Sequence, residues 1–212
     1  MLAGQSLTNN GTVAGGLIVS SGALATGGGA YGNVTNLSGG LFSPGDGGHT
    51  NFIINLSLSD SSTNRFWIGS PALHDMSFLS NSLALTDIGT PLLQLDLRAY
   101  AGASGTIVLY DNVFAGMSGF DGTNTFLRLS DMLGPNDNLI LGNGVTFAAV
   151  GGGSATNLFT IRYDFNADGD GVNNDIVLTV IPEPASLNLL LVLGAAYWLG
   201  RRRLSPRVRL NR

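Results

Sequence analysis

Three gaps in composition narrow the chemistry open to this 212-residue chain, which has no cysteine, no lysine and only two histidines. Without Cys it has no disulfide framework, no thiolate ligand for zinc or an iron–sulfur cluster, and no cysteine nucleophile. Without Lys it has neither a Schiff-base amine nor the lysine of a Walker-type phosphate loop. The range of enzymes that this sequence can encode is therefore small.

Charged residues are also few, at 11% of the chain, and they are unevenly distributed. Residues 1–184 contain all 14 acidic residues and only four Arg, which gives this part a formal charge of −10. The last 28 residues contain six Arg and no acid, and carry +6. Because phosphate binding needs a basic surface, we expect no nucleic-acid partner for the acidic part. The basic end indicates a segment with its own role.

An uncharged, Leu-rich run of sixteen residues, 185–200, precedes the basic end. It predicts a single C-terminal transmembrane helix, but at ~1.5 Å per residue its length of about 24 Å is short for a hydrocarbon core of ~30 Å. Tyr197 and Trp198 stand beside three consecutive Arg at 201–203, the order that marks the cytoplasmic face of a membrane. We therefore expect a cytoplasmic tail at 201–212 and a body outside the membrane. The alternative is a buried core helix of a globular protein.

A proline-rich linker, residues 181–184, separates the apolar run from the body. Two prolines spaced by one residue lack two N–H donors and hold the backbone extended, so neither a strand nor a helix continues through them. We expect an exposed, protease-accessible segment. The linker, the short apolar helix and the Arg cluster together resemble the PEP-CTERM sorting signal of exported bacterial proteins. The residues that carry this motif are Pro182, Glu183, Pro184, Arg201, Arg202 and Arg203.

The resemblance implies how such a chain is handled by the cell. An exosortase, a membrane protease of the transpeptidase type, removes the tail near the linker. The body then passes from the membrane to the cell surface or the extracellular polysaccharide matrix. Residues 1–10 contain no basic or apolar region of a secretory signal peptide, so we expect the native chain to begin further upstream.

The N-terminal part of the body contains a weak repeat. Residues 21–28 align with residues 38–45 at an offset of 17, and the same offset places Leu7 one coil earlier and Leu58 one coil later. Short coils with one apolar position and Gly-rich corners are typical of a β-solenoid, in which each coil is stabilised by stacking on the next. The alternative is a flexible Gly/Ser/Asn linker.

Further along the chain the predicted strands become longer and the repeat fades. Leu93, Leu95, Leu97 and Ala99 alternate with polar residues, which is the period of a half-buried strand. Residues 1–180 are therefore predicted as an all-β, right-handed β-helix or solenoid-like body. Seven further segments are predicted as strands: 51–58, 65–68, 106–110, 125–129, 145–150, 158–163 and 176–181.

The body also resembles the C-terminal part of autotransporter-associated β-strand repeat proteins. The resemblance is carried by residues 39–45, 106–110 and 174–180. It implies a right-handed β-helix that is exported as a surface module, and it identifies no ligand.

One acidic segment has the oxygen spacing of a calcium loop. Its candidate ligands occupy positions 1, 3, 5, 7 and 12, with Gly169 at the sharp turn. The flanking segments are predicted as strands, so this is no EF-hand. The alternative is a hairpin loop in which Asp, Asn and Gly satisfy the geometry of the turn. The candidate calcium ligands are Asp164, Asn166, Asp168, Asp170 and Asp175.

Signals for catalysis are weak. His49 and His74 both fall in predicted loops, no Gly-x-Ser-x-Gly elbow occurs, and the Asp residues are spread singly through turns. We therefore expect no enzyme and no cofactor, but an exported surface or matrix structural protein whose partners are an exosortase, the membrane and exopolysaccharide. The alternative is an extracellular carbohydrate-binding or polysaccharide-active β-helix protein.

Overall fold

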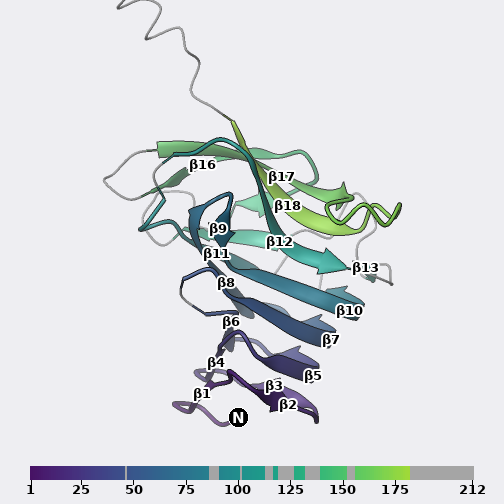
Figure 1. Ribbon diagram of the computed structural model, residues 1–212. Helices are drawn as coiled ribbons and strands as arrows, with labels where there is room; N and C mark the ends of the chain where they lie inside the picture. Colours follow the sequence, from purple (N-terminus) through teal and green to yellow (C-terminus); the bar gives the residue numbers. More distant parts are fainter. Residues whose placement is uncertain are drawn as a thin grey trace, which may run out of the picture. The chain divides into compact units, whose positions relative to one another are not determined.

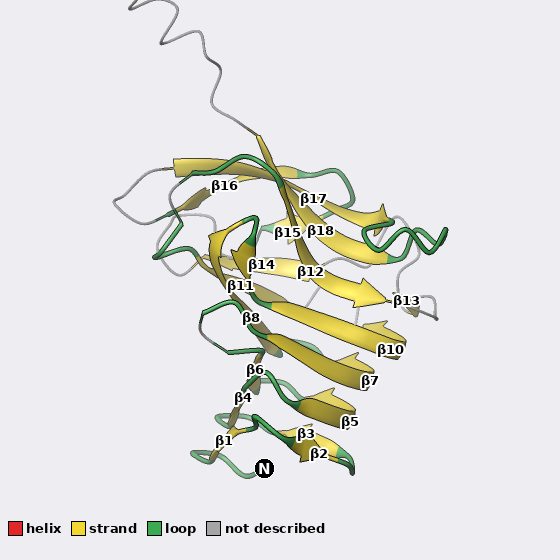
Figure 2. Cartoon of the chain, viewed as in Figure 1, coloured by secondary structure: helices red, strands yellow, loops and turns green. Residues whose placement is uncertain are grey.

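The computed structural model describes most of the body as β-structure. The described residues are 1–45, 47–85, 91–100, 102–112, 117–118, 127–131, 139–151 and 156–181. Within these ranges the chain forms strands, turns and loops and no helix (Figure 1, Figure 2). The predicted all-β class of the body is confirmed.

The chain divides into two compact units, Met1–Pro182 and Glu183–Arg212. The linker residues 182–184, the predicted transmembrane helix at 185–200 and the basic tail at 201–212 lie outside the described residues. In the described part of the chain, no helix has the length and apolar character needed to cross a membrane.

Two sheets make up the first unit. In the first sheet the strands follow the order β1 (Ser6–Thr8), β4 (Leu24–Thr26), β6 (Leu41–Ser43), β8 (Thr63–Ser70), β11 (Leu92–Asp96), β14 (Leu127–Asp131) and β15 (Ile140–Leu141), with β9 (Leu73–His74) beside β8. In the second sheet the order is β16 (Thr146–Val150), β17 (Thr156–Phe165), β18 (Asp175–Ile181), β12 (Thr106–Asn112), β10 (Met76–Leu85), β7 (Thr50–Leu58), β5 (Ala30–Asn36) and β2 (Thr12–Val13). Two short strands complete it: β3 (Leu17–Val19) pairs with β5, and β13 (Met117–Ser118) pairs with β10.

From β1 to β12 the chain passes repeatedly from one sheet to the other. Each of these main strands pairs in parallel with the strand one coil later, as β4 does with β6 and β5 with β7 (Figure 1). Parallel neighbours need a crossover connection, and here each crossover carries the strand of the opposite sheet. The result is a stack of coils whose inward side chains lie between the two sheets.

The register of the coils corrects the predicted repeat. Leu24 pairs with Leu41, so the offset of 17 holds for these two coils. Leu7 pairs with Ala25 instead of Leu24, which makes the preceding coil one residue longer. The residue that follows Leu41 in the stack is Thr63, because the next coil is longer. Leu58 lies in the second sheet and pairs with Asn36, so its predicted place in the repeat is wrong.

The core runs between the sheets as one cluster of buried aliphatic and aromatic side chains. Along β7, Ile53, Leu56 and Leu58 lie in the interior with at most 1% of their surface exposed. Phe66 of β8 meets Tyr110 of β12 edge to face across the core, at 5.0 Å between ring centroids. Because inward residues are buried and their neighbours point outward, the chemistry of the outer faces is set by every second residue.

Antiparallel strands end the parallel stack. β18 adds antiparallel to β12, and β17 and β16 follow it in the same sense. Asp175, at the start of β18, is fully buried and accepts a hydrogen bond from the backbone N of Asn112 at 2.9 Å. This bond ties the antiparallel strands to the last parallel strand of the second sheet.

Candidate binding site on the second sheet

A row of aligned residues crosses the outer face of the second sheet. In the β-pairing, Thr12 lies beside Ala30, Ala30 beside Phe52, Phe52 beside Phe78, and Phe78 beside Asp111. Phe52 exposes 50% of its surface although it stands between two buried residues, so its ring points outward. Residues that are register partners share one face of a sheet. We call this series the outer row.

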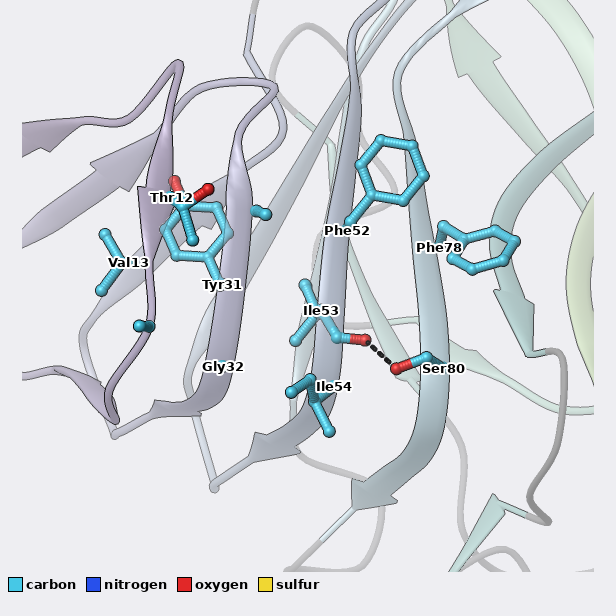
Figure 3. A pocket seen from close by; sticks show the side chains of 11 residues that line it. Thr12, Val13, Tyr31, Gly32, Phe52, Ile53, Ile54, Phe78 and Ser80 are labelled. Carbon is cyan, nitrogen blue, oxygen red and sulfur yellow. Dashed lines mark hydrogen bonds between the residues drawn. The ribbon is translucent and has the colours of Figure 1, made fainter.

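A groove of about 350 Å³ lies over β2, β5, β7 and β10 along the outer row. Thr12 lies on one side of this groove, and Phe52 and Ile54 lie on the other (Figure 3). The small side chain of Ala30, on β5, lies between Thr12 and Phe52 in the outer row. The rings of Phe52 and Phe78 stand 5.5 Å apart, tilted by 55°. Phe52 is exposed and Phe78 is half-buried. An aromatic pair that is partly open to solvent beside an apolar groove is the type of surface that receives a ligand.

Exposed amides lie further along the same strands. The Asn55 side chain donates to Asn33 Oδ1 at 2.7 Å, and the Asn81 side chain donates to Asn55 Oδ1 at 2.6 Å. The hydroxyl of Ser82 donates to the same Asn55 oxygen at 2.7 Å. This amide row joins three neighbouring strands and places polar side chains on the face that holds the aromatic pair.

Asp111 ends the outer row at β12. Its Oδ1 atom is buried and makes no hydrogen bond within the described residues. Burial, and then the nearby carboxylates of Asp175, Asp168 and Asp170, raise the pKa of Asp111 to about 6. The sequence places Asp111 more than fifty residues before these groups, and the pairing of β12 with β18 brings them together. The strand pairing therefore places Asp111 within electrostatic range of carboxylates that are far from it in the sequence.

Three of the predicted calcium residues, Asn166, Asp168 and Asp170, lie in the loop between β17 and β18, and each accepts a hydrogen bond from nearby backbone. Asn166 accepts from the N–H of Gly169 at 2.6 Å, Asp168 from Asp170 at 3.0 Å, and Asp170 from Val172 at 2.6 Å. Such bonds are typical of Asx turns. They support the hairpin-loop interpretation that the sequence left open.

Asp164 and Asp175, the first and last residues of the predicted calcium set, have other hydrogen-bond partners than the three loop residues. The guanidinium of Arg162 donates to Asp164 at 3.1 Å and holds the pKa of that carboxyl below its usual value. Asp175 uses both carboxylate oxygens to accept backbone N–H groups, from Asn112 and from Ala167, and burial raises its pKa. In the described part of the chain, no three or more acidic or His side chains are arranged to hold a metal ion. Calcium binding stays a prediction.

The two histidines occupy different environments. His49 is exposed in the turn before β7, as predicted, whereas His74 is half-buried and belongs to the short strand β9 instead of a loop. The neighbouring carboxylate of Asp75 accepts the backbone N–H of His49 and not its imidazole. The absence of enzymatic activity remains a prediction.

Comparison of the chain with protein-family models, curated protein sequences and solved structures gives no match. Its function is therefore inferred from its own residues and geometry.

The raised pKa of Asp111 gives a pH-dependent contribution to stability. A carboxyl whose pKa is higher in the folded state stabilises the fold fully below its unfolded pKa, and this contribution is lost as pH rises through the folded value of about 6. We expect the free energy of unfolding of the native chain to fall, relative to that of Asp111→Asn, between about pH 5 and pH 7. Urea unfolding at both pH values measures it. Asp60→Asn, in an exposed turn, serves as control, and equal pH slopes for the native chain and Asp111→Asn would contradict the prediction.

Proposed function

We propose that this chain is an exported, non-enzymatic structural protein of the bacterial cell surface or extracellular matrix. Its body is a right-handed β-helix, and its C-terminal segment is a sorting signal of the PEP-CTERM type that an exosortase removes. The proposal combines the resemblance of the tail with the architecture of the body. A stack of coils that contact mainly their neighbours suits an extended structural module.

The observation that best supports the proposal is that the described β-structure ends at the Pro-Glu-Pro linker. The boundary between the two compact units falls between Pro182 and Glu183, within the Pro-Glu-Pro linker. The last strand, β18, ends at Ile181, so the first unit ends where the sorting motif begins. Cleavage at the linker therefore leaves every described strand in the mature body. Where a sorting signal is cut from a protein that must remain folded, this is the expected arrangement.

The test follows the C-terminus of the mature protein. The full chain is expressed behind a cleavable secretion leader in a bacterium that has an exosortase, and the product is analysed by intact mass. We expect the native chain to end at or near the linker and to leave the membrane fraction. In the triple variant with Pro182, Glu183 and Pro184 all changed to Ala, cleavage should fall at least about tenfold, with the uncut chain retained in the membrane fraction.

Pro206→Ala is the matched control, because it removes a proline from the tail without touching the linker. It should be processed like the native chain. Equal cleavage of the native chain and the triple variant, or a native chain that stays intact and dissolved in the cytosol, would refute the proposed sorting. A second host strain without exosortase separates specific processing from general proteolysis, since cleavage in both strains also counts against the proposal.

Carbohydrate binding is the second candidate function, and the groove on the second sheet favours it. Phe52 and Phe78 present aromatic rings on an outer face, next to exposed Asn and Ser side chains. Aromatic rings with a few convergent polar groups are the common composition of small-ligand sites. A matrix protein with such a face would bind the polymer that surrounds it.

A further inference from the structure

The outer face of the second sheet is anionic at one end, and the strands that form the groove carry no cationic side chain. None of the strands β2, β5, β7, β10 and β12 contains an Arg, and the chain has no Lys. Arg65 donates to Gln94 on the first sheet at 2.7 Å. Arg162, on β17, is bonded to Asp164. The groove therefore suits a ligand that is neutral or cationic and disfavours phosphates, uronates and nucleic acid.

We propose that this groove binds a cationic amino-sugar chain, an oligosaccharide of hexosamine units with free amino groups. In this complex the C–H faces of the sugar rings lie over Phe52 and Phe78, and an ammonium group meets the carboxylate of Asp111. The inference deepens the proposed matrix role, since a matrix polymer is the ligand, and it rests on that role for its biological meaning.

The aromatic pair fits successive sugar rings. Phe52 and Phe78 belong to adjacent parallel strands and are register partners. Neighbouring strands lie ~4.8 Å apart, a spacing comparable with the width of a pyranose ring. The face of an aromatic ring is electron-rich, so it attracts the positively polarised C–H groups of a sugar and, more strongly, an ammonium. A chain that runs across the strands therefore places one unit over each ring.

Charge selects the amino sugar among carbohydrates. Asp111 follows Phe78 in the outer row, and its Oδ1 has no hydrogen-bond partner among the described residues. The carboxylates of Asp168 and Asp170 are near enough to raise its proton affinity. An ammonium beside the partly exposed Asp111 side chain offsets the repulsion between the carboxylates. A neutral sugar chain stacks on the rings but leaves the carboxylates uncompensated.

Exposed amides supply the polar contacts that hydroxyl groups need. Asn33, Asn55 and Asn81 each carry two amide hydrogens, of which one on Asn55 and one on Asn81 are used within the amide row. The others can donate to sugar hydroxyls. The face thus combines aromatic, amide and carboxylate groups, which match the C–H faces, hydroxyls and amines of a hexosamine chain.

The test is calorimetric titration of the full chain in a non-ionic detergent without a sugar headgroup. Glucosamine hexamer is the cationic probe, N-acetylglucosamine hexamer and cellohexaose are neutral probes, and a galacturonate oligomer is the anionic probe. We expect glucosamine hexamer to bind at least about tenfold more tightly than the neutral probes, and the galacturonate oligomer not to bind. The preference for the amino sugar should fall as salt is added.

Variants separate the two parts of the site. Phe52→Ala and Phe78→Ala should each reduce the affinity for glucosamine hexamer by about fivefold or more. Asp111→Asn should reduce the affinity for glucosamine hexamer to that for N-acetylglucosamine hexamer. The affinity for N-acetylglucosamine hexamer should not change. Matched controls are Ile18→Ala, an exposed apolar residue of the same sheet outside the groove, and Asp60→Asn. Both controls should bind like the native chain.

Three results would overturn the inference. One is a native chain that does not bind glucosamine hexamer. Another is an equal loss of binding in Asp60→Asn and Asp111→Asn, together with displacement of glucosamine hexamer by spermine at similar concentrations. Such a result would mean that the acidic protein attracts any polycation. The third is binding that the two Phe variants leave unchanged. Because none of these measurements depends on processing of the tail, failure here leaves the sorting proposal standing, and the reverse also holds.

Discussion

Replacement of Gly27 by alanine should destabilise the body by about 3 kcal/mol or more, a large effect for the addition of one methyl group. Gly27 follows β4, and its φ of 115° belongs to a region that only glycine adopts readily. A Cβ atom there would stand 2.2 Å from the carbonyl oxygen of Asn9 in the preceding coil, and 2.8 Å from the Asn9 backbone N and C. The obstacle is backbone, so no side-chain rotation relieves it.

Asn9 is itself fixed by hydrogen bonds on both sides. Its backbone N–H donates to Thr26 at 2.8 Å, its carbonyl accepts from Gly29 at 2.9 Å, and its amide donates to the Ala30 carbonyl at 3.0 Å. Any shift that makes room for a methyl group at position 27 therefore breaks contacts between two coils. The expected consequence is local separation of β1 from β4 at lower denaturant concentration.

Gly47→Ala is the matched control for this variant. Gly47 has nearly the same φ, 118°, but a Cβ atom added there has nothing within 4 Å. Its substitution should cost only the backbone strain, about 1–2 kcal/mol. Urea unfolding of the full chain, followed by circular dichroism, gives the two values. Equal destabilisation by both variants would show that strain alone matters and would contradict the predicted clash between coils.

The sequence predicted those parts of the fold that depend on local alternation. The segments 51–58, 106–110 and 176–181 became β7, β12 and β18 with small changes at their ends. Part of each buried face consists of apolar residues two positions apart, such as Leu56 and Leu58 in β7 and Ile107 and Leu109 in β12, and this part can be read from the sequence pattern. The offset of 17 between Leu24 and Leu41 was equally readable, because two neighbouring coils of equal length repeat both their turns and their apolar positions.

The longest strands were harder to predict where the pattern is interrupted. β10, Met76–Leu85, contains several Ser and Asn residues, and its register against β7 shifts between Leu79 and Ser82. A β-bulge of this kind places consecutive residues on one face and cancels the alternation. A similar limit applies after Leu97, where the strand has already ended at Asp96. Ala99 is exposed instead of buried, and Tyr100 takes the interior position.

The candidate site was beyond sequence reasoning because its residues come from coils of unequal length. Phe52 and Phe78 are register partners, yet no repeat of constant period connects them, since the coils lengthen along the chain. Asp111 joins the loop carboxylates only through the pairing of β12 with β18. Residue type gave no signal either, because Phe in a strand usually indicates core. The outward direction of Phe52 follows from the inward direction of Ile53, which the register fixes.

Asp75 is another residue whose importance appears only in three dimensions. Its side chain is fully buried between β9 and β10. Oδ1 accepts the backbone N–H groups of His49 at 2.9 Å and Gly48 at 3.2 Å, and Oδ2 accepts that of Trp67 at 2.9 Å. One carboxylate thus satisfies three backbone donors from the turn before β7 and from β8. Burial raises its pKa, and the three hydrogen bonds act in the opposite direction.

Asp75→Ala should therefore lower the free energy of unfolding by about 3–5 kcal/mol, because it leaves three N–H groups without an acceptor, at ~1–3 kcal/mol for each one that stays buried. Asp75→Asn should cost less, since its carbonyl oxygen still serves two of the donors while its NH₂ group faces the third. Asp60→Ala, in an exposed turn, is the matched control and should change stability by no more than about 0.5 kcal/mol. Urea unfolding of the full chain ranks the three variants. A loss below about 1 kcal/mol in Asp75→Ala would mean that water reaches these donors and that Asp75 does not hold the coils together.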